Sequence, residues 1–466
     1  MNKGLKPLNS SRLKDQRGVT VLLVAVLMSL LLGFTALAVD LSNLYVVRNE
    51  LQNSADAGAL AGARFLYNDS GAAVNPGANL IAFTAARDNR ALAITGAVPV
   101  DVNWSGGNAG DVQRGHWSFT TRTFTANEYT GAPVLWGRTW GDLDTDQSFI
   151  NAVKVVARRQ ATPAASFFAR VFGYQNFQLS AEAVAYIGFA GSLAENEIDQ
   201  PIAICIQSIT DDYKIYGCNI GRMLNSGGNI ATSNTGAWTN FTQPCETASV
   251  PTMRPLICSE GNPGPMTFYE GIGTVNGVQD TIFRDLEQCW RGATGDGTTP
   301  WEVTLPVIDC PSNAISNCAT LLTAVTVKVV WVQRDNPGYR NAPKAMRDDE
   351  KGINWPSDAD LDDTTVGELQ KYFVGINSSD LFPVHLSALP VRDVFYQGTE
   401  DAGRVRWASF VKTFELKNVG SPASAPYATL AQKSIYFLPS CTPHPPLGDT
   451  GGPNTGILAK IPKLVE

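Results

Sequence analysis

The 466-residue sequence has few of the residues and motifs on which catalysis or nucleic-acid binding depends. It has only 3 histidines, and it lacks a Gly-x-Ser-x-Gly elbow, a Walker loop, a dinucleotide fingerprint and a His-Glu-x-x-His zinc motif. Its formal net charge of -7 offers no basic surface that would hold a phosphate backbone. The composition therefore disfavours an enzyme, argues against nucleic acid as a partner and predicts no cofactor.

Cysteine is missing from the first part of the chain and does not occur before position 205. The even number of cysteines and the absence of a CxxC spacing predict disulfide bonds, and a reduced metal site is the alternative. The short loop between Cys310 and Cys318 makes these two our predicted pair, while the other pairings stay open. The disulfide candidates are Cys205, Cys218, Cys245, Cys258, Cys289, Cys310, Cys318 and Cys441.

Charge is absent from the 21 residues between Val19 and Val39, which read VTVLLVAVLMSLLLGFTALAV. At about 1.5 Å per residue, such a helix spans roughly 30 Å of hydrocarbon. Basic residues precede the segment and Asp40 follows it, so the positive-inside rule predicts a cytoplasmic N-terminus. We expect a single-pass protein of a bacterial inner membrane, with the bulk of the chain periplasmic or extracellular.

Cleavage of this N-terminal segment is the alternative to a retained anchor. Ala36-Leu37-Ala38 fits a signal-peptidase site, but the apolar run is longer than the roughly 7–15 residues of a signal peptide. Gly18 also ends a basic leader like those of type IV prepilins, which carry glutamate where this chain has Leu23. We therefore predict a retained transmembrane helix.

A helical pattern continues after the membrane segment, over residues 40–66, and its apolar face consists of very small residues. Such a face allows another helix to approach closely. The partner is either a helix of the same domain or a helix of another chain. The helix-packing candidates are Ala55, Gly58, Ala59 and Gly62.

The N-terminal region resembles TadE/TadG-like proteins of the Tad (Flp) pilus-assembly system. From Arg17 to Ala63 it has, in order, Arg-Gly, a membrane run, an aspartate, an aromatic-x-x-Arg turn, Leu-Gln-Asn and Ala-Asp-Ala before Ala-Gly-Ala. Residues 149–188 continue the resemblance, which implies other pilus-assembly or envelope proteins as partners. Some members have a von Willebrand factor A domain, but its Asp-x-Ser-x-Ser metal loop is missing here, and residues 40–44 are only its nearest match.

The chain is longer than one hydrophobic core usually organises, so we predict an α+β protein with several parts. These are a cytoplasmic tail (1–18), the transmembrane helix (19–39), the Ala-rich helix (40–66), a small mixed α/β unit (67–200), a mostly β cysteine-bearing domain (201–445) and a C-terminal tail (446–466). Hydrophobic patterns predict strands over residues 152–158, 177–186, 323–333, 404–416 and 434–438, with a short helix over 166–171.

An acidic segment supplies the one metal candidate, a calcium site made of Asp358, Asp360, Asp362 and Glu368. Its spacing departs from an EF-hand loop, because Asp363 occupies the glycine position and Leu369 the closing acidic position. The alternative is an exposed acidic loop that caps a helix beginning near Thr364.

Two functions fit these features, and an envelope hydrolase whose site is assembled from residues distant in sequence is a third alternative. The first is a membrane-anchored, non-enzymatic structural or assembly component of a Tad/Flp-type pilus or a related envelope apparatus. The second is a surface adhesin or ligand-binding module, whose recognition face would use tryptophans that otherwise belong to the core. These tryptophans are Trp290, Trp301, Trp331, Trp355 and Trp407.

Overall fold

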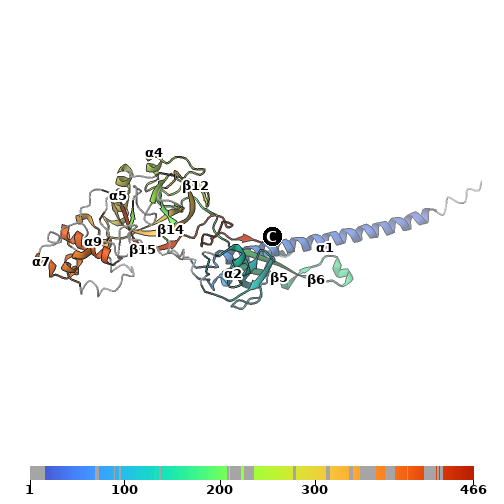
Figure 1. Cartoon of the computed structure of the whole chain (residues 1–466). Helices are drawn as coiled ribbons and strands as arrows, with labels where there is room; N and C mark the ends of the chain where they lie inside the picture. Colours follow the sequence, from blue (N-terminus) through green and yellow to red (C-terminus); the bar gives the residue numbers. More distant parts are fainter. Residues whose placement is uncertain are drawn as a thin grey trace, which may run out of the picture.

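Two large β-sheets and a long N-terminal helix organise the described part of the chain in the computed structural model (Figure 1), and two further sheets have two strands each. The structure describes residues 16–68, 73–88, 90–93, 96–131, 133–135, 138–206, 209, 222–224, 236–275, 280–310, 315–334, 339–346, 364–372, 384–395, 397–413, 427, 430 and 434–465. Helices and sheets are both present, so the predicted α+β class is confirmed.

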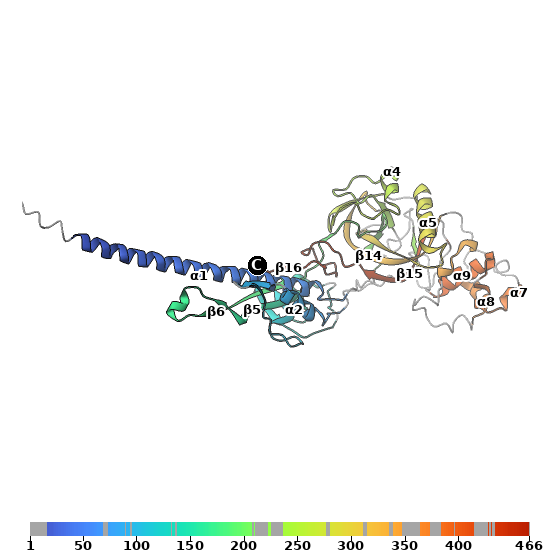
Figure 2. The same cartoon turned by 180° about the vertical axis from the view of Figure 1, so that it is seen from behind.

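The helix α1 (Gln16–Arg64) is continuous over 49 residues, and its two halves have different surroundings. From Val19 to Val39 its large apolar side chains are exposed, whereas from Asp40 onward one face is buried. Among the described residues, α1 is the one helix long and apolar enough to cross a membrane. Figures 1 and 2 show its N-terminal half projecting away from the folded units.

The buried half of α1 packs on an antiparallel five-stranded sheet with the order β16-β6-β5-β3-β4. The strands are β3 (Val112–Ser118), β4 (Thr123–Ala126), β5 (Ala152–Ala165), β6 (Asn176–Tyr186) and β16 (Lys463–Leu464). The other elements of this five-stranded unit are α2 (Ala78–Asp88), β1 (Arg90–Ala93), β2 (Gly96–Pro99), α3 (Trp140–Thr145) and the 3-10 helix η2 (Ala169–Phe172).

The strands β5 and β6 form a hairpin that is longer than the rest of the sheet. β3 pairs with β5 only as far as Val155, while β5 and β6 stay paired as far as Ala165 and Asn176. The turn contains η2, so the predicted helix over residues 166–171 is a single short 3-10 turn. In Figure 1 the hairpin extends beside α1 in the direction of the N-terminal half of that helix.

The C-terminal residues return to the five-stranded unit. Thr450 and Leu458 form bridges with Ala190 and Phe189, and β16 adds an edge strand beside β6. The second sheet is thus inserted into the chain between β6 and β16. Both of its connections lead back to the unit that carries α1.

The second unit contains a seven-stranded sheet with the order β12-β10-β8-β13-β14-β15-β9. β12 also pairs with the beginning of β14, so that β12, β10, β8, β13 and β14 form a closed ring of paired strands. The strands are β8 (Ile202–Cys205), β9 (Arg222–Leu224), β10 (Gly236–Thr239), β12 (Gly271–Val275), β13 (Trp301–Ile308), β14 (Cys318–Gln333) and β15 (Ser434–Pro443). The strands predicted over residues 323–333 and 434–438 are confirmed within β14 and β15.

Helices and short strands complete the seven-stranded unit, and its largest core joins the sheet to α5 (Asp280–Thr294) and α9 (Glu400–Thr413). The smaller elements are β7 (Ser192–Leu193), α4 (Val250–Met253), η5 (Arg254–Leu256), β11 (Met266–Thr267), η6 (Tyr339–Asn341), η7 (Lys344–Met346), η9 (Val366–Tyr372), α7 (Val384–Ser387) and α8 (Val391–Phe395).

The strand predicted over residues 404–416 is wrong, because the helix α9 occupies this segment as far as Thr413, and residues 414–416 lie outside the described residues. The alternation in Arg404-Val405-Arg406-Trp407 imitates a half-buried strand. The helix is instead buried on several sides, which hides its 3.6-residue period: Arg406 is buried together with Val405 and Trp407. The Thr399 hydroxyl accepts the N–H of Ala402, and this helix-capping pattern was the signal for the correct assignment.

Candidate functional site

The junction between α1 and the five-stranded sheet is built from very small side chains. Ala55 and Ala59 are fully buried, and Gly58 and Gly62 lie beside them on the same face. A Cβ atom would lie 2.8 Å from the Ala86 Cβ if added at Gly58, and 2.7 Å from the Ala82 Cβ if added at Gly62. All four helix-packing candidates therefore lie where α1 meets α2 and β5, inside the same chain.

The carboxylate of Asp40 forms a second connection between α1 and the sheet. Its Oδ1 accepts the N–H of Phe167 at 2.6 Å, and its Oδ2 accepts the N–H groups of Phe168 and Ala169 at 3.0 and 2.6 Å. These amides begin the turn of η2 at the tip of the β5–β6 hairpin. Asp40 thus fixes the hairpin tip at the point where the exposed apolar half of α1 ends.

The environment of Asp40 favours its ionised form. Partial desolvation raises the pKa of the carboxyl, but the backbone N–H groups of Phe167, Ala169 and Phe168 and the positive charge of Arg170 together lower it below the ordinary value. Asp40 is only 5% exposed, so a buried negative charge is balanced here by oriented amide dipoles. Sequence reasoning placed Asp40 at the membrane edge but gave no sign of its partners, which lie more than 120 residues away.

The hairpin tip itself has an apolar surface. Val171 and Phe172 are 79% and 80% exposed, and no residue of η2 is buried. Phe168 and Tyr174 are exposed beside them, and Gly173 turns the chain with a φ of +92°. The sequence Phe-Phe-Ala-Arg-Val-Phe-Gly-Tyr shows that apolar residues cluster here. A short helix with such a pattern usually buries its apolar residues, so the sequence did not predict that they are exposed.

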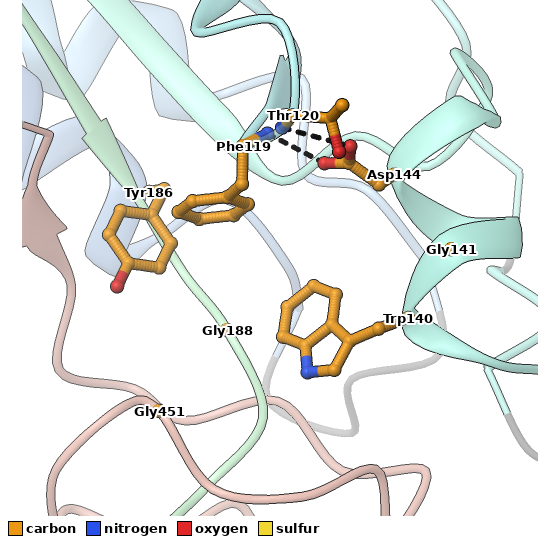
Figure 3. Close-up of a pocket in the computed structure, with 8 residues that line it drawn as sticks. All are labelled: Phe119, Thr120, Trp140, Gly141, Asp144, Tyr186, Gly188 and Gly451. Carbon is orange, nitrogen blue, oxygen red and sulfur yellow. Dashed lines mark hydrogen bonds between the residues drawn. The ribbon is translucent and has the colours of Figure 1, made fainter.

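A cavity of about 360 Å³ lies at the opposite end of the five-stranded sheet from the hairpin tip. The rings of Phe119, Trp140 and Tyr186 surround it, with Gly188 and Gly451 on the remaining side (Figure 3). The Phe119 ring is edge-on to both other rings, at centroid distances of 5.8 Å to Trp140 and 4.8 Å to Tyr186. The cavity therefore offers aromatic faces to a ligand.

The carboxylate beside this cavity belongs to Asp144, and its oxygens are already occupied by the chain. Asp144 accepts the N–H groups of Phe119 and Thr120 at 2.6 and 3.1 Å and the hydroxyl of Ser118 at 3.0 Å. Desolvation raises the pKa of Asp144, but hydrogen bonds from the side chain and backbone of Thr120, the backbone of Phe119 and the hydroxyl of Ser118 together lower it to below its usual range. Nearby, the two ring nitrogens of His116 lie within hydrogen-bond distance of the backbone carbonyl oxygens of Phe149 and Asp144. The contacts of Asp144 and His116 therefore hold the fold together at this point.

The calcium candidate is only partly within the described residues. Asp358, Asp360 and Asp362 lie outside them, while Glu368 lies in η9 and accepts the N–H of Thr365 at 3.0 Å. This contact resembles the capping role that we gave as the alternative. In the part of the chain that the structure describes, no group of three metal-ligating side chains occurs.

The cysteines form disulfides within the seven-stranded unit, but the predicted Cys310–Cys318 pair is wrong. Cys310 pairs with Cys205 and Cys318 pairs with Cys245, at Cα distances of 5.6 and 5.5 Å. The ring of strands explains the error, because Cys205 ends β8 and Cys310 lies two residues after Ile308, which ends the neighbouring strand β13 and pairs with Cys205. Cys258 pairs with Cys289, Cys441 is also disulfide-bonded, and Cys218 lies outside the described residues.

The tryptophans proposed for a recognition face lie largely in the core. Trp290, Trp331 and Trp407 are each 1% exposed, and Trp301 packs against the same core. Trp355 lies outside the described residues. The four described tryptophans of this set therefore stabilise the seven-stranded unit by burial and offer no shared binding surface.

Two known protein families match adjoining segments of the chain. Residues 18–64 match the family described as Flp pilus-assembly TadE/G-like, and residues 61–185 match the family described as Tad-like Flp pilus-assembly. The first match covers α1 from Gly18, and the second continues to Ala185 in β6, so both sides of the junction lie within matched segments. No curated protein and no solved structure matches the chain.

Proposed function

Because residues 18–185 carry both Tad segments, the chain is a TadE/TadG-like Tad (Flp) pilus-assembly protein, and we propose that it serves as a membrane-anchored, non-enzymatic structural or assembly component. The observation that carries this proposal is the division of α1. One half is an uncharged run of 21 residues whose large apolar side chains are exposed, and the other half is packed into a folded unit by small side chains and Asp40.

The proposed topology is a single span of an inner membrane with a cytoplasmic N-terminus. Basic residues precede Val19, and Asp40 closes the span on the other side. The disulfides of the seven-stranded unit support an oxidising compartment for the bulk of the chain. We keep the proposed divisions at residues 18, 39, 66, 200 and 445, and we propose other pilus-assembly or envelope proteins as partners.

A continuous helix suits an assembly component for a mechanical reason. An unbroken α-helix keeps its backbone hydrogen bonds across the membrane boundary, so the folded unit cannot swivel freely about a flexible linker. The packed face of α1 begins with Asp40, immediately after the apolar half. The sheet is therefore held at a defined height above the membrane, which a scaffold for other subunits requires.

Complementation of a deletion strain tests this function. The full chain should restore Flp pili, counted by electron microscopy, and a chain with the residues of Val19–Val39 in shuffled order should do the same, because length and apolarity are kept. A chain whose residues 1–39 are replaced by a cleavable signal peptide should be exported without restoring pili. Restoration by this secreted form would show that anchoring is unnecessary, and failure of the full chain would remove the pilus role.

The aromatic cavity favours a second candidate function, ligand binding by the five-stranded unit. The aromatic rings that line the cavity suit the apolar faces of sugar rings, and the carboxylate of Asp144 is already satisfied. Titration of the full chain with envelope glycans, followed by tryptophan fluorescence, tests this candidate. Trp140→Ala should abolish the response. Tyr129→Ala should preserve it, because Tyr129 is an exposed aromatic residue outside the cavity. Equal responses in both variants would exclude the cavity as the site.

A further inference from the structure

We propose that the tip of the β5–β6 hairpin is a second membrane contact, which inserts Val171 and Phe172 into the outer interface of the bilayer that α1 crosses. The tip comprises residues 168–174. This inference rests on the proposed membrane span. It adds a lipid-binding site on a part of the chain that is distant in sequence from the transmembrane helix.

The first argument is the chemistry of the tip. Water-exposed turns favour Gly, Asn, Asp, Ser and Pro, whereas this turn exposes Phe168, Val171, Phe172 and Tyr174 together. Clustered exposed apolar side chains of this size mark an interaction surface. Phenylalanine and valine suit the hydrocarbon boundary, and tyrosine is enriched at the level of the headgroups.

The second argument is the height of the tip. Asp40 holds the amides of Phe167, Phe168 and Ala169, so the turn begins level with the first residue after the apolar half of α1. Asn43, one turn further along α1, donates to the carbonyl of Ala165 and holds the preceding strand. The remaining residues of the turn extend from this fixed point in the direction of the apolar half of α1 (Figures 1 and 2).

The third argument identifies what covers the tip. The side chains of Val19–Val39 are exposed in the chain itself, and a bilayer is the partner that covers them in the proposed function. The turn that carries Val171 and Phe172 contacts α1 at Asp40, which follows this apolar half directly, so the same bilayer lies next to the turn. Exposed Arg170 lies at the same height, where its guanidinium can pair with a lipid phosphate.

Two contacts on one bilayer define an orientation that one helix cannot define. A single span leaves the folded unit free to rotate about the helix axis. A second contact to one side of α1 fixes this rotation and the tilt of the helix. The five-stranded sheet then presents one constant side to neighbouring proteins in the membrane plane.

Fluorescence quenching by nitroxide lipids tests this inference on the full chain in liposomes of phosphatidylethanolamine and phosphatidylglycerol. An environment-sensitive thiol probe is attached to single added cysteines in the variants Phe172→Cys, Thr121→Cys and Leu31→Cys, with the native disulfides kept oxidised. Thr121 is the matched control, because it is an exposed position in the β3–β4 turn at the end of the sheet away from the hairpin tip.

The expected result separates the three positions. The probe at residue 172 should shift its emission to the blue and be quenched by nitroxides near the headgroup, the probe at residue 31 should be quenched by nitroxides deep in the chains, and the probe at residue 121 should resemble a probe in water. If residue 31 is quenched but residue 172 behaves like residue 121, the tip proposal is overturned and the anchor stands. If residue 31 is not quenched, the span itself is refuted.

A fourth result would also overturn the inference. A probe at residue 172 that is shielded from water but not quenched by any nitroxide lipid would mean that protein, and not lipid, covers the tip. Cross-linking through the same cysteine would then identify whether the cover is a second copy of this chain. Repetition with Phe168→Cys checks that the result belongs to the surface and not to one position.

Discussion

Replacement of Asp40 should loosen the hairpin tip without unfolding the unit that carries it. Asp40→Ala removes the acceptor of three backbone N–H groups at Phe167, Phe168 and Ala169. Charged hydrogen bonds contribute roughly 1.5–3 kcal/mol each, but the freed amides at this exposed turn can bind water, so we discount the total to about 2 kcal/mol. That loss corresponds to an increase of about 30-fold in local opening.

Hydrogen exchange read by mass spectrometry measures this opening in the membrane-reconstituted chain. Amides of residues 166–170 should exchange about 30-fold faster in Asp40→Ala and by a smaller factor in Asp40→Asn, because asparagine keeps one carbonyl oxygen as an acceptor. Amides of β14 should not change. Asp56→Asn is the matched control on α1, because the Asp56 carboxylate accepts from Gln52 on the same helix.

Acidification should reproduce the effect of Asp40→Ala in the unmodified chain. The pKa of Asp40 is lowered in the folded state, so its stabilising contribution is complete above its unfolded pKa of about 3.9 and is lost as pH falls through the lower folded value. Tip exchange, corrected for the intrinsic effect of pH, should therefore be constant between pH 5 and 7 and rise only below about pH 4. Unchanged protection in Asp40→Ala, or loosening that spreads to β14, would refute this account of Asp40.

Two further substitutions test the packing of the units. Gly62→Val should destabilise the five-stranded unit by about 1–3 kcal/mol, because α2 and β5 leave no room for a Cβ. The control Gly292→Ala, at an open position in α5, should be neutral. Equal thermal stability of both variants would contradict the tight junction. Loss of the Cys205–Cys310 bond by double serine substitution should cost about 3–5 kcal/mol in urea unfolding, since it closes a long loop. Peptide mapping should recover this bond, and a linked Cys310–Cys318 peptide would contradict it.

The α1 helix illustrates what the sequence reveals well. A run of 21 uncharged apolar residues and a following pattern of small residues predict a long two-part helix, because both features are local. Which surface the small face of Gly58 and Gly62 contacts is not local information. The contact with α2 depends on the intervening turn and on the sheet beneath, so sequence reasoning left two partners open.

The disulfides and α9 show where local reasoning fails. Cys310 and Cys318 are near in sequence, but strand pairing places Cys205 beside Cys310 across 105 residues. In α9, burial on several sides removes the polar face from which a helical period is recognised. The Asp40 contacts were equally hidden, because an aspartate at a membrane edge has the same local sequence whether its partner is water or a distant turn.

Protease protection in intact and permeabilised cells, with mass spectrometry of the recovered N-terminus, tests the central claim most directly. The account predicts that residues 1–18 are protected in intact cells, that the recovered chain is uncleaved at Gly18 and Ala38, and that the bulk of the chain is cut as soon as protease reaches its compartment. A recovered N-terminus at Val19 or Val39, or digestion of the basic tail together with the sheet units from outside, would contradict a retained anchor with a cytoplasmic N-terminus.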